Sequence, residues 1–226
     1  MSFFTASKSK EDVQQSGGSA YINASGCYPV NIIAPFASVS NNGSTTVDLF
    51  VEHEGQQQVV YGNMRISNND GSRNDIGAKV LNQLMIVTGV EDLADPVEAE
   101  LPIGKAGAAQ DVGVLEDLAD FDVIMRVQME YSVWNKNIQE KKIIKGFFRA
   151  EDNASAEEIV NETEAGVQFE KETKYFENVT YKDGLDADAI AAWVAAGRPK
   201  GTGGSGTAST AAKKPSFSKR TGFGKK

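Results

Sequence analysis

The chain has 226 residues, of which 40% are hydrophobic, so it can bury a sizeable core in one large domain or two small ones. Its single cysteine, Cys27, excludes a disulfide framework and indicates a reducing compartment. No run approaches the roughly eighteen apolar residues of a membrane helix, and the N-terminus lacks a basic stretch followed by an apolar one. We therefore expect a soluble protein without a membrane segment.

The net charge of −8 conceals an asymmetry along the chain. Residues 198–226 contain eight basic side chains and no acidic one, which leaves 15 basic and 31 acidic side chains in the preceding 197 residues. An acidic body argues against nucleic-acid binding, because contact with phosphate is driven by positive charge. Only the field along a binding groove acts on a ligand, however, so a local basic surface would suffice.

The N-terminal part of the chain predicts a polar arm and a three-stranded meander. Residues 1–26 are rich in Gly and Ser and predict a flexible arm. Runs of β-branched and alternating apolar residues, separated by turn residues, predict three strands: Tyr28–Val39, Val47–Val51 and Val59–Ile66.

The segment 76–88 repeats apolar residues at helical spacing and predicts a helix. Asn74 or Asp75 can cap its start, and Gly89 can end it. Residues 90–120 then predict a long irregular crossover, in which Glu-Asp-Leu-Ala-Asp occurs twice, at 91–95 and 116–120. Long irregular insertions in compact domains tend to be functional.

The clearest strand pattern follows the crossover. Alternate residues from Val123 to Tyr131 are apolar, and a loop at 135–139 leads into a second strand, Lys142–Arg149. This pattern predicts a long hairpin whose Val123 side faces the core. Because the alternation has a period of two, Arg126 and Trp134 lie together on the opposite face.

The C-terminal part predicts two helices and a tail. Ser155-Ala156-Glu157-Glu158 is a capping box that opens a short acidic helix, and a last helix near Asp186–Ala196 places Ile190, Trp193 and Val194 on one face. Residues 198–226 predict a flexible Gly-rich linker and a basic tail, because they are too polar and too short to fold alone.

Three strands, a helix and a long hairpin are the element order of a five-stranded OB barrel, with its helix between the third and fourth strands. We therefore predict a mainly β protein: an OB-like domain over residues 27–197, followed by C-terminal helices and a disordered basic tail.

The residues offer little for catalysis, so we expect no enzyme, no cofactor and no bound metal. His53 is the only histidine, which rules out a site with several histidine ligands. Cys27 and His53 could form a thiol pair, but a lone cysteine at the start of a strand is more often a packing residue. The acidic repeats could bind a divalent cation only if their oxygens converged.

The hairpin has the composition of a single-strand-binding surface. Between Phe121 and Ala150, six basic residues outnumber three acidic ones, and aromatic residues lie among them. Cations can follow phosphates while ring faces accept unstacked bases, at about 1–3 kcal/mol per base. The alternative is that the basic residues of the hairpin form a solvated face while its aromatic side chains pack in the core. The candidate DNA contacts are Arg126, Tyr131, Trp134, Lys136, Lys142, Lys145, Phe147 and Arg149, with Tyr61 and Arg65 ranked above Phe36 and Phe50 on the meander.

Several segments resemble phage-encoded single-stranded-DNA-binding proteins. They are Gly26–Ile32, Gly77–Leu84, and Met125–Tyr131 leading to Glu140–Phe148, and the likeness covers about residues 20–200. The resemblance implies an OB barrel that coats single strands cooperatively, as homo-oligomers on DNA, during replication and recombination in the cytoplasm of an infected bacterium. The alternatives are a phage structural or adaptor protein without nucleic-acid binding, and an RNA-binding module.

The tail departs from this resemblance, because many such proteins end in an acidic tail that recruits partners. Here two phenylalanines lie among six basic residues, which suits an apolar pocket with an acidic rim on a replication, recombination or transcription protein. The expected partner-binding residues are Lys213, Lys214, Phe217, Lys219, Arg220, Phe223, Lys225 and Lys226.

Overall fold

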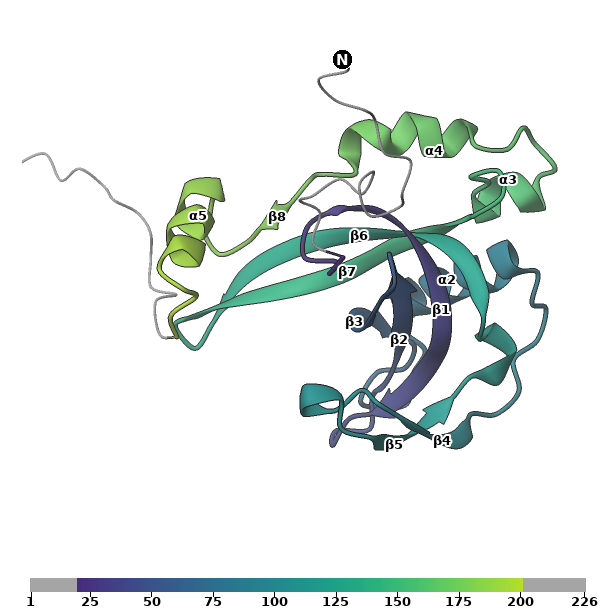
Figure 1. Ribbon diagram of the computed structural model, residues 1–226, viewed down its shortest axis with the longest axis horizontal. Helices are drawn as coiled ribbons and strands as arrows, with labels where there is room; N and C mark the ends of the chain where they lie inside the picture. The colour runs from purple at the N-terminus through teal and green to yellow at the C-terminus, as the bar shows by residue number, and fades with distance from the viewer. Residues whose placement is uncertain (1–19, 201–226) are drawn as a thin grey trace, which may run out of the picture. The chain divides into compact units, whose positions relative to one another are not determined.

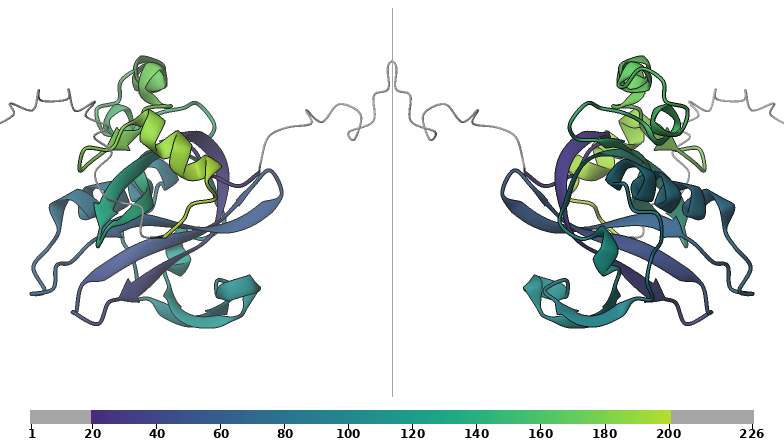
Figure 2. Two further views of the ribbon diagram at one scale, coloured as in Figure 1. Left: turned by 90° about the vertical axis from the view of Figure 1, so that its left-hand side faces the viewer. Right: turned by 90° about the vertical axis from the view of Figure 1, so that its right-hand side faces the viewer.

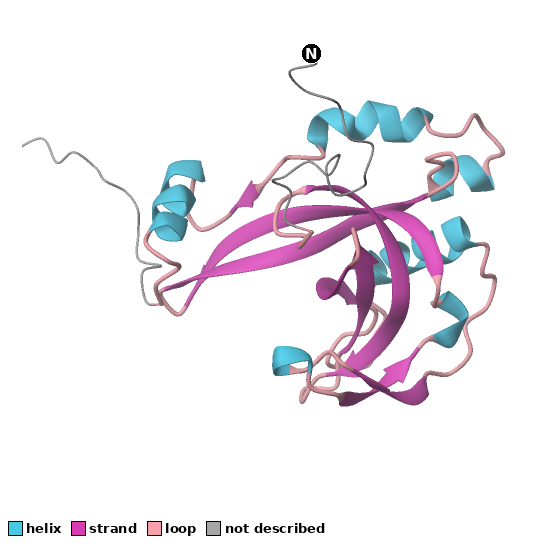
Figure 3. Ribbon diagram, in the orientation of Figure 1, coloured by secondary structure: helices cyan, strands magenta, loops and turns pink. Residues whose placement is uncertain are grey.

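The computed structural model describes residues 20–200, without the side chains of residues 62, 63 and 106. The protein is mainly β, with 41% of residues in strands and 24% in helices. An antiparallel sheet of eight strands dominates it (Figures 1 and 3). None of the helices in the described part of the chain is long and apolar enough to span a bilayer. The tail residues 213–226 and residues 1–19 lie outside the described residues.

The predicted meander and helix are confirmed. The strands are β1 (Gly26–Val39), β2 (Thr45–His53) and β3 (Gln56–Arg65), and the helix is α2 (Asp75–Thr88). Asn74 is the N-cap of α2, because its side chain accepts a hydrogen bond from the Gly77 backbone N–H at 3.2 Å. Gly89 ends the helix in the left-handed region at φ 73°, where glycine has no steric cost.

The predicted arm over residues 1–26 is too long, because the chain joins the folded body by residue 20. Ile22 is fully buried in the main core. The Gln58 side chain fixes the backbone around it: its Nε2 donates to the Ala20 carbonyl at 2.9 Å, and its Oε1 accepts from the Ile22 N–H at 2.9 Å.

β1 curves strongly because its pairing is irregular (Figure 1). Its register with β2 shifts between Ile32 and Ala34, and such a bulge increases strand twist and reverses the side-chain alternation. Ile32 therefore packs in the main core, whereas Ala34 and Phe36 pack in a second, smaller core. One strand thus supplies two apolar clusters.

The prediction of an irregular crossover at 90–120 is wrong in part, because this segment adds two strands to the sheet. This segment contains β4 (Val97–Leu101) and β5 (Gln110–Val114), which pair with each other, with the short 3-10 helices Lys105–Gly107 and Glu116–Leu118 nearby. β5 also pairs with β1, where Phe36 lies opposite Val114, and so covers the second core. The acidic repeats meet at one hydrogen bond, from the Ala94 N–H to Asp117 Oδ2 at 2.8 Å.

The long hairpin is confirmed as β6 (Phe121–Trp134) and β7 (Asn137–Arg149). Its turn is tighter than predicted, since only Asn135 and Lys136 connect the strands and both have positive φ, as a type I′ turn requires. The alternate residues from Val123 to Tyr131 are all buried, as their spacing predicted.

The C-terminal segments include two elements that the sequence predicted. α3 (Ala156–Val160) begins with the expected capping box at Ser155 and Glu158. α5 (Ala187–Ala195) buries Ile190 and Trp193, but Val194 is 39% exposed. Between these helices lie α4 (Val167–Glu172), a 3-10 turn at Thr173–Tyr175 and the two-residue strand β8 (Thr180–Tyr181), none of which was predicted.

The described chain separates into two compact units. The first comprises residues up to Tyr131 together with Gln139–Thr180, and the second comprises Ser132–Ile138 and residues from Tyr181 onward. The predicted domain at 27–197 spans both. The first unit contains both apolar cores.

Gly77 allows α2 to lie directly on β3. A Cβ atom at this position would lie 2.0 Å from the Arg65 carbonyl oxygen and 2.6 Å from the Arg65 backbone nitrogen. Both atoms belong to backbone and cannot rotate away. Figure 2 shows α2 from two sides.

We expect Gly77→Ala to destabilise the protein by at least about 2 kcal/mol, because the added methyl group forces α2 off β3. Helix propensity alone gives the opposite sign, a gain of about 1 kcal/mol. Urea denaturation measures the difference. Asn82→Ala, on the exposed side of α2, is the control and should change stability by less than about 0.5 kcal/mol. A Gly77→Ala protein as stable as the control would contradict the contact.

Candidate functional site

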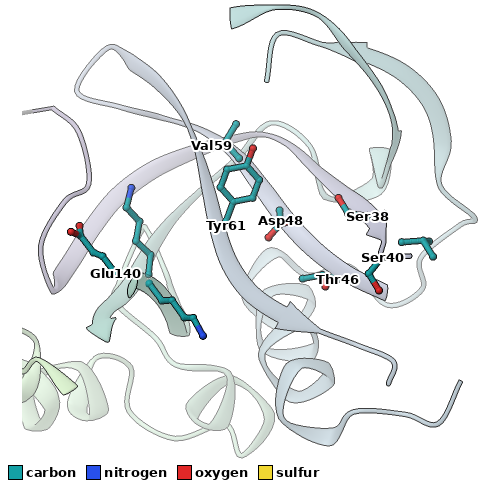
Figure 4. Close-up of a pocket in the computed structure, with 10 residues that line it drawn as sticks. Ser38, Ser40, Thr46, Asp48, Val59, Tyr61 and Glu140 are labelled. Atoms are coloured by element: carbon teal, nitrogen blue, oxygen red, sulfur yellow. The ribbon is translucent and has the colours of Figure 1, made fainter. Parts of the chain in front are cut away.

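The sheet is open in the first unit, because two long strands each pair along only one edge. Among the described residues, β3 pairs with β2 and β7 pairs with β6, and β3 and β7 do not pair with each other. A hollow of about 470 Å³ lies between these two strands and the end of β1 (Figure 4). We call this hollow the seam groove. Its lining residues are Ser38, Val39, Ser40, Thr46, Asp48, Val59, Tyr61, Glu140, Lys141 and Lys142.

A bulge in β3 determines how the groove is lined. Val47 on β2 pairs with Met64, whereas Leu49 pairs with Val60, so residues 61–63 of β3 lie opposite Asp48 alone. Bulges of this kind redirect side chains and are frequent beside functional sites. Here the bulge brings the Tyr61 ring, which is 60% exposed, next to the Asp48 side chain, which is almost fully buried (Figure 4).

Two lysines come to the groove from β7. Lys141 is exposed and Lys142 is half-buried. Partial burial lowers the pKa of the Lys142 ammonium, and Glu140 opposes this shift. Lysines at an unpaired strand edge also prevent edge-to-edge aggregation, which is the simplest alternative explanation for them.

Arg65 lies at one end of the same surface. It is exposed and pairs with Thr46 across β2 and β3, and residues directly opposite each other project from the same face of a sheet. Since Thr46 lines the groove, Arg65 projects on the groove side. The lining of the groove itself carries two cations, Lys141 and Lys142, and the carboxylates of Asp48 and Glu140, whereas Arg65 lines a separate hollow with Asn68, Asn69 and Asp70.

The hairpin does not present its predicted cations as one surface. Arg126 is only 17% exposed and forms an ion pair with Glu172, and its guanidinium lies 5.6 Å from the centre of the Phe176 ring. Arg149 binds Asp152 through two hydrogen bonds, of 3.0 and 2.6 Å. Both cations are therefore engaged by carboxylates. Lys145 is exposed but lines a separate polar cavity of about 120 Å³ that also contains Arg126 and Glu172.

Two predicted aromatic contacts are wrong because their rings are in the protein interior. Tyr131 is 8% exposed and Phe147 is 3% exposed, so neither ring face is open to a base. On the meander, Phe36 and Phe50 are buried in the second core, whereas Tyr61 is exposed, in agreement with their predicted ranking.

The remaining predicted contacts, Trp134 and Lys136, belong to the second unit. Both are exposed, and Trp134 is 66% exposed at the end of β6. The Val133 N–H donates to Asp183 Oδ2 at 2.8 Å, which fixes the hairpin tip within this unit. The tip is thus a second exposed aromatic and basic pair, separate from the seam groove.

Cys27 and His53 do not form a pair. Burial raises the pKa of the Cys27 thiol to about 12, an effect that Arg126 opposes and Glu172 reinforces, so the thiolate is disfavoured at neutral pH. His53 is buried, with Nδ1 at 2.8 Å from the Pro29 carbonyl oxygen and its ring edge-on to Tyr28. Within residues 20–200, no group of three or more His, Cys, Asp or Glu side chains is arranged to hold a metal ion.

Sequence reasoning missed most of the groove lining. Lys141 is one of the six basic residues of the hairpin but is not among the predicted DNA contacts. Asp48 is a polar position within the predicted strand Val47–Val51 and was not predicted to have a function. The bulge that joins Asp48 to Tyr61 leaves no mark in the alternation of β3. The neighbouring Lys141 and Lys142 were the available signal, because lysines are frequent along an unpaired edge of a sheet.

Comparison with known proteins adds no family to this description. No protein-family model matches the chain, and no curated protein matches it.

The placement of Arg126 leads to a test of stability. We expect Arg126→Ala to lower the free energy of unfolding by about 2–3 kcal/mol, somewhat less than for a fully buried pair, because it leaves the Glu172 carboxylate without its cation. Urea denaturation would measure this loss. Lys79→Ala, at an exposed position of α2 away from this ion pair, is the control, with a change below about 0.5 kcal/mol. If the two variants were equally stable, the ion pair would be unimportant to the fold.

Proposed function

We propose that this protein binds single-stranded DNA in the seam groove and coats it with little sequence preference, without catalysing a reaction. The observation that carries the proposal is the exposed Tyr61 ring beside Lys141 and Lys142 in one groove. Non-specific single-strand binding needs this combination, since ring faces stack on bases and cations follow the backbone.

The element order supports an OB-type architecture for the first unit. The meander, the helix and the long hairpin follow one another in the order of that fold, and β1 pairs with β6 in the antiparallel sense. In this interpretation β1, β2, β3, β6 and β7 are the five barrel strands. β4 and β5 form an inserted hairpin, and the barrel is open between β3 and β7.

The groove also suits a phosphate electrostatically. Partial burial has already removed some of the water around the Lys142 ammonium, which lowers its pKa. A phosphate that binds this ammonium restores favourable interactions that the lost water no longer provides. Because the body is acidic elsewhere, a DNA backbone is attracted to this region and repelled by most of the remaining surface.

The C-terminal tail keeps the role proposed from its sequence, which is recruitment of a replication, recombination or transcription protein. Its residues lie outside those that the structure describes. A basic and aromatic tail on a Gly-rich linker could meet such a partner while the groove holds DNA.

A titration with labelled oligonucleotides tests the function itself. We expect tight binding of a dT oligomer and weak binding of duplex, because stacking on Tyr61 requires unstacked bases. Affinity should fall with salt, with a slope of about −0.7 per neutralised phosphate. Tighter binding of rU than dT would favour an RNA-binding module. If neither strand bound, the structural or adaptor alternative would replace the proposal.

Variants of the groove test its location. We expect Lys141→Ala with Lys142→Ala to weaken dT binding about tenfold and to flatten the salt slope by about 1.4. Tyr61→Ala should weaken binding by about 1–3 kcal/mol and leave the slope unchanged, because stacking is not ionic.

The control for the lysine pair is Lys171→Ala with Lys174→Ala, which removes two exposed cations from α4 and the turn after it. The net charge changes equally in both double variants. Equal losses of affinity would mean that only overall charge matters, and the groove would then not be the binding site.

A further inference from the structure

Asp48 is an unusual residue for the floor of a DNA-binding groove. It is 6% exposed, lines the groove and lies opposite the β3 bulge that carries Tyr61. A carboxylate at this position repels phosphate, so backbone binding alone does not explain it. Figure 4 shows its side chain beside the Tyr61 ring, where a stacked base would lie.

An Asp side chain in its ionised form accepts hydrogen bonds and cannot donate them. Its hydrogen bonds are charge-assisted, which makes them about twice as strong as those between neutral groups. Because a carboxylate has roughly four lone-pair sites, a contact within the protein leaves acceptor capacity for a ligand. Asp48 therefore favours a base edge that presents amino hydrogens.

The four bases differ in this property. Cytosine presents its N4 amine and adenine its N6 amine, and guanine presents an N2 amine. Thymine has no exocyclic amine, and its single ring N–H lies between two carbonyl oxygens whose lone pairs face the carboxylate. A base stacked on Tyr61 is thus read at its edge by Asp48, and thymine is the least favoured.

We propose that Asp48 is a specificity-determining residue of the groove, which makes the nucleotide at Tyr61 prefer a base with an exocyclic amine. The inference rests on the proposed function and deepens it, since one position shows a preference while the rest of the bound strand does not. The neighbouring Ser38 and Thr46 hydroxyls both donate and accept hydrogen bonds, so they do not impose this selection.

The test removes one amine from the ligand and leaves the protein unchanged. Binding of a dC oligomer is compared with binding of an oligomer of the same length that contains 2-pyrimidinone, which is cytosine without its N4 amine. We expect the wild-type protein to bind the pyrimidinone oligomer about fivefold to tenfold more weakly. This comparison does not depend on the folding of any variant.

Asp48→Asn then assigns the effect to the carboxylate. The amide has the same shape but is a neutral acceptor, so we expect the ratio of the two affinities to fall at least threefold. Glu98→Gln, at an exposed position of β4, makes the same change of net charge and should keep the wild-type ratio. A purely structural role for Asp48 would leave the ratio unchanged.

The outcomes separate this inference from the proposed function. If the wild-type protein binds both oligomers tightly and equally, the role of Asp48 is overturned while single-strand binding stands. If it binds neither, the proposed function fails, and the inference fails with it. If Glu98→Gln shifts the ratio as much as Asp48→Asn, a general charge effect replaces base recognition.

Discussion

The hydrogen-bonding edges of β1 are the constraint on which the rest of the sheet depends. β1 pairs with β2. The same strand also pairs with β6 along its first half and with β5 near its end. β3 therefore reaches β1 only through β2, and β7 only through β6, and in the described chain β3 and β7 do not pair with each other, so each keeps an unpaired edge. The bulge between Ile32 and Ala34 lets the same strand serve both apolar cores. An open sheet with a groove at its seam follows from these pairings.

The groove explains how an acidic protein could hold a polyanion. Its lysines come from β7 and its exposed tyrosine from β3, two strands that do not pair with each other, and the β3 bulge removes Tyr61 from regular register. Elsewhere the cations of the hairpin stabilise the fold. Arg126 joins β6 to α4 through Glu172. Phe148 of β7, Phe169 of α4 and Phe176 after it form an aromatic cluster with ring centres 5.1–6.3 Å apart. Basic residues of one strand pair thus have different roles, according to the carboxylates that the fold brings to them.

Local sequence patterns were sufficient for most of the elements. Caps at Asn74, Gly89 and Ser155 were correct because a cap depends on residues within one helical turn. The alternation from Val123 to Tyr131 gave the buried face of β6, because burial on a sheet has a period of two. The residues of the candidate site were harder to predict from the sequence. The partner of Arg126 is 46 residues away, and the seam groove joins four segments that composition does not connect. The hairpin composition pointed to Lys142, which lines the groove, but also to Arg126 and Arg149, which carboxylates engage, and to Tyr131 and Phe147, which are buried.

Photo-crosslinking offers the most direct test of the central claim, which is that the open seam holds the DNA. The full-length protein would be irradiated with an oligomer that carries 5-iodo-2′-deoxycytidine, which keeps the N4 amine, at one position, and the adducts would be mapped by mass spectrometry. We expect the adducts on the peptide that contains Tyr61 and on residues 139–142 of β7, with the yield reduced by excess unlabelled dT. Adducts confined to Trp134 at the hairpin tip, or to α4, would contradict this claim and place the DNA on another surface.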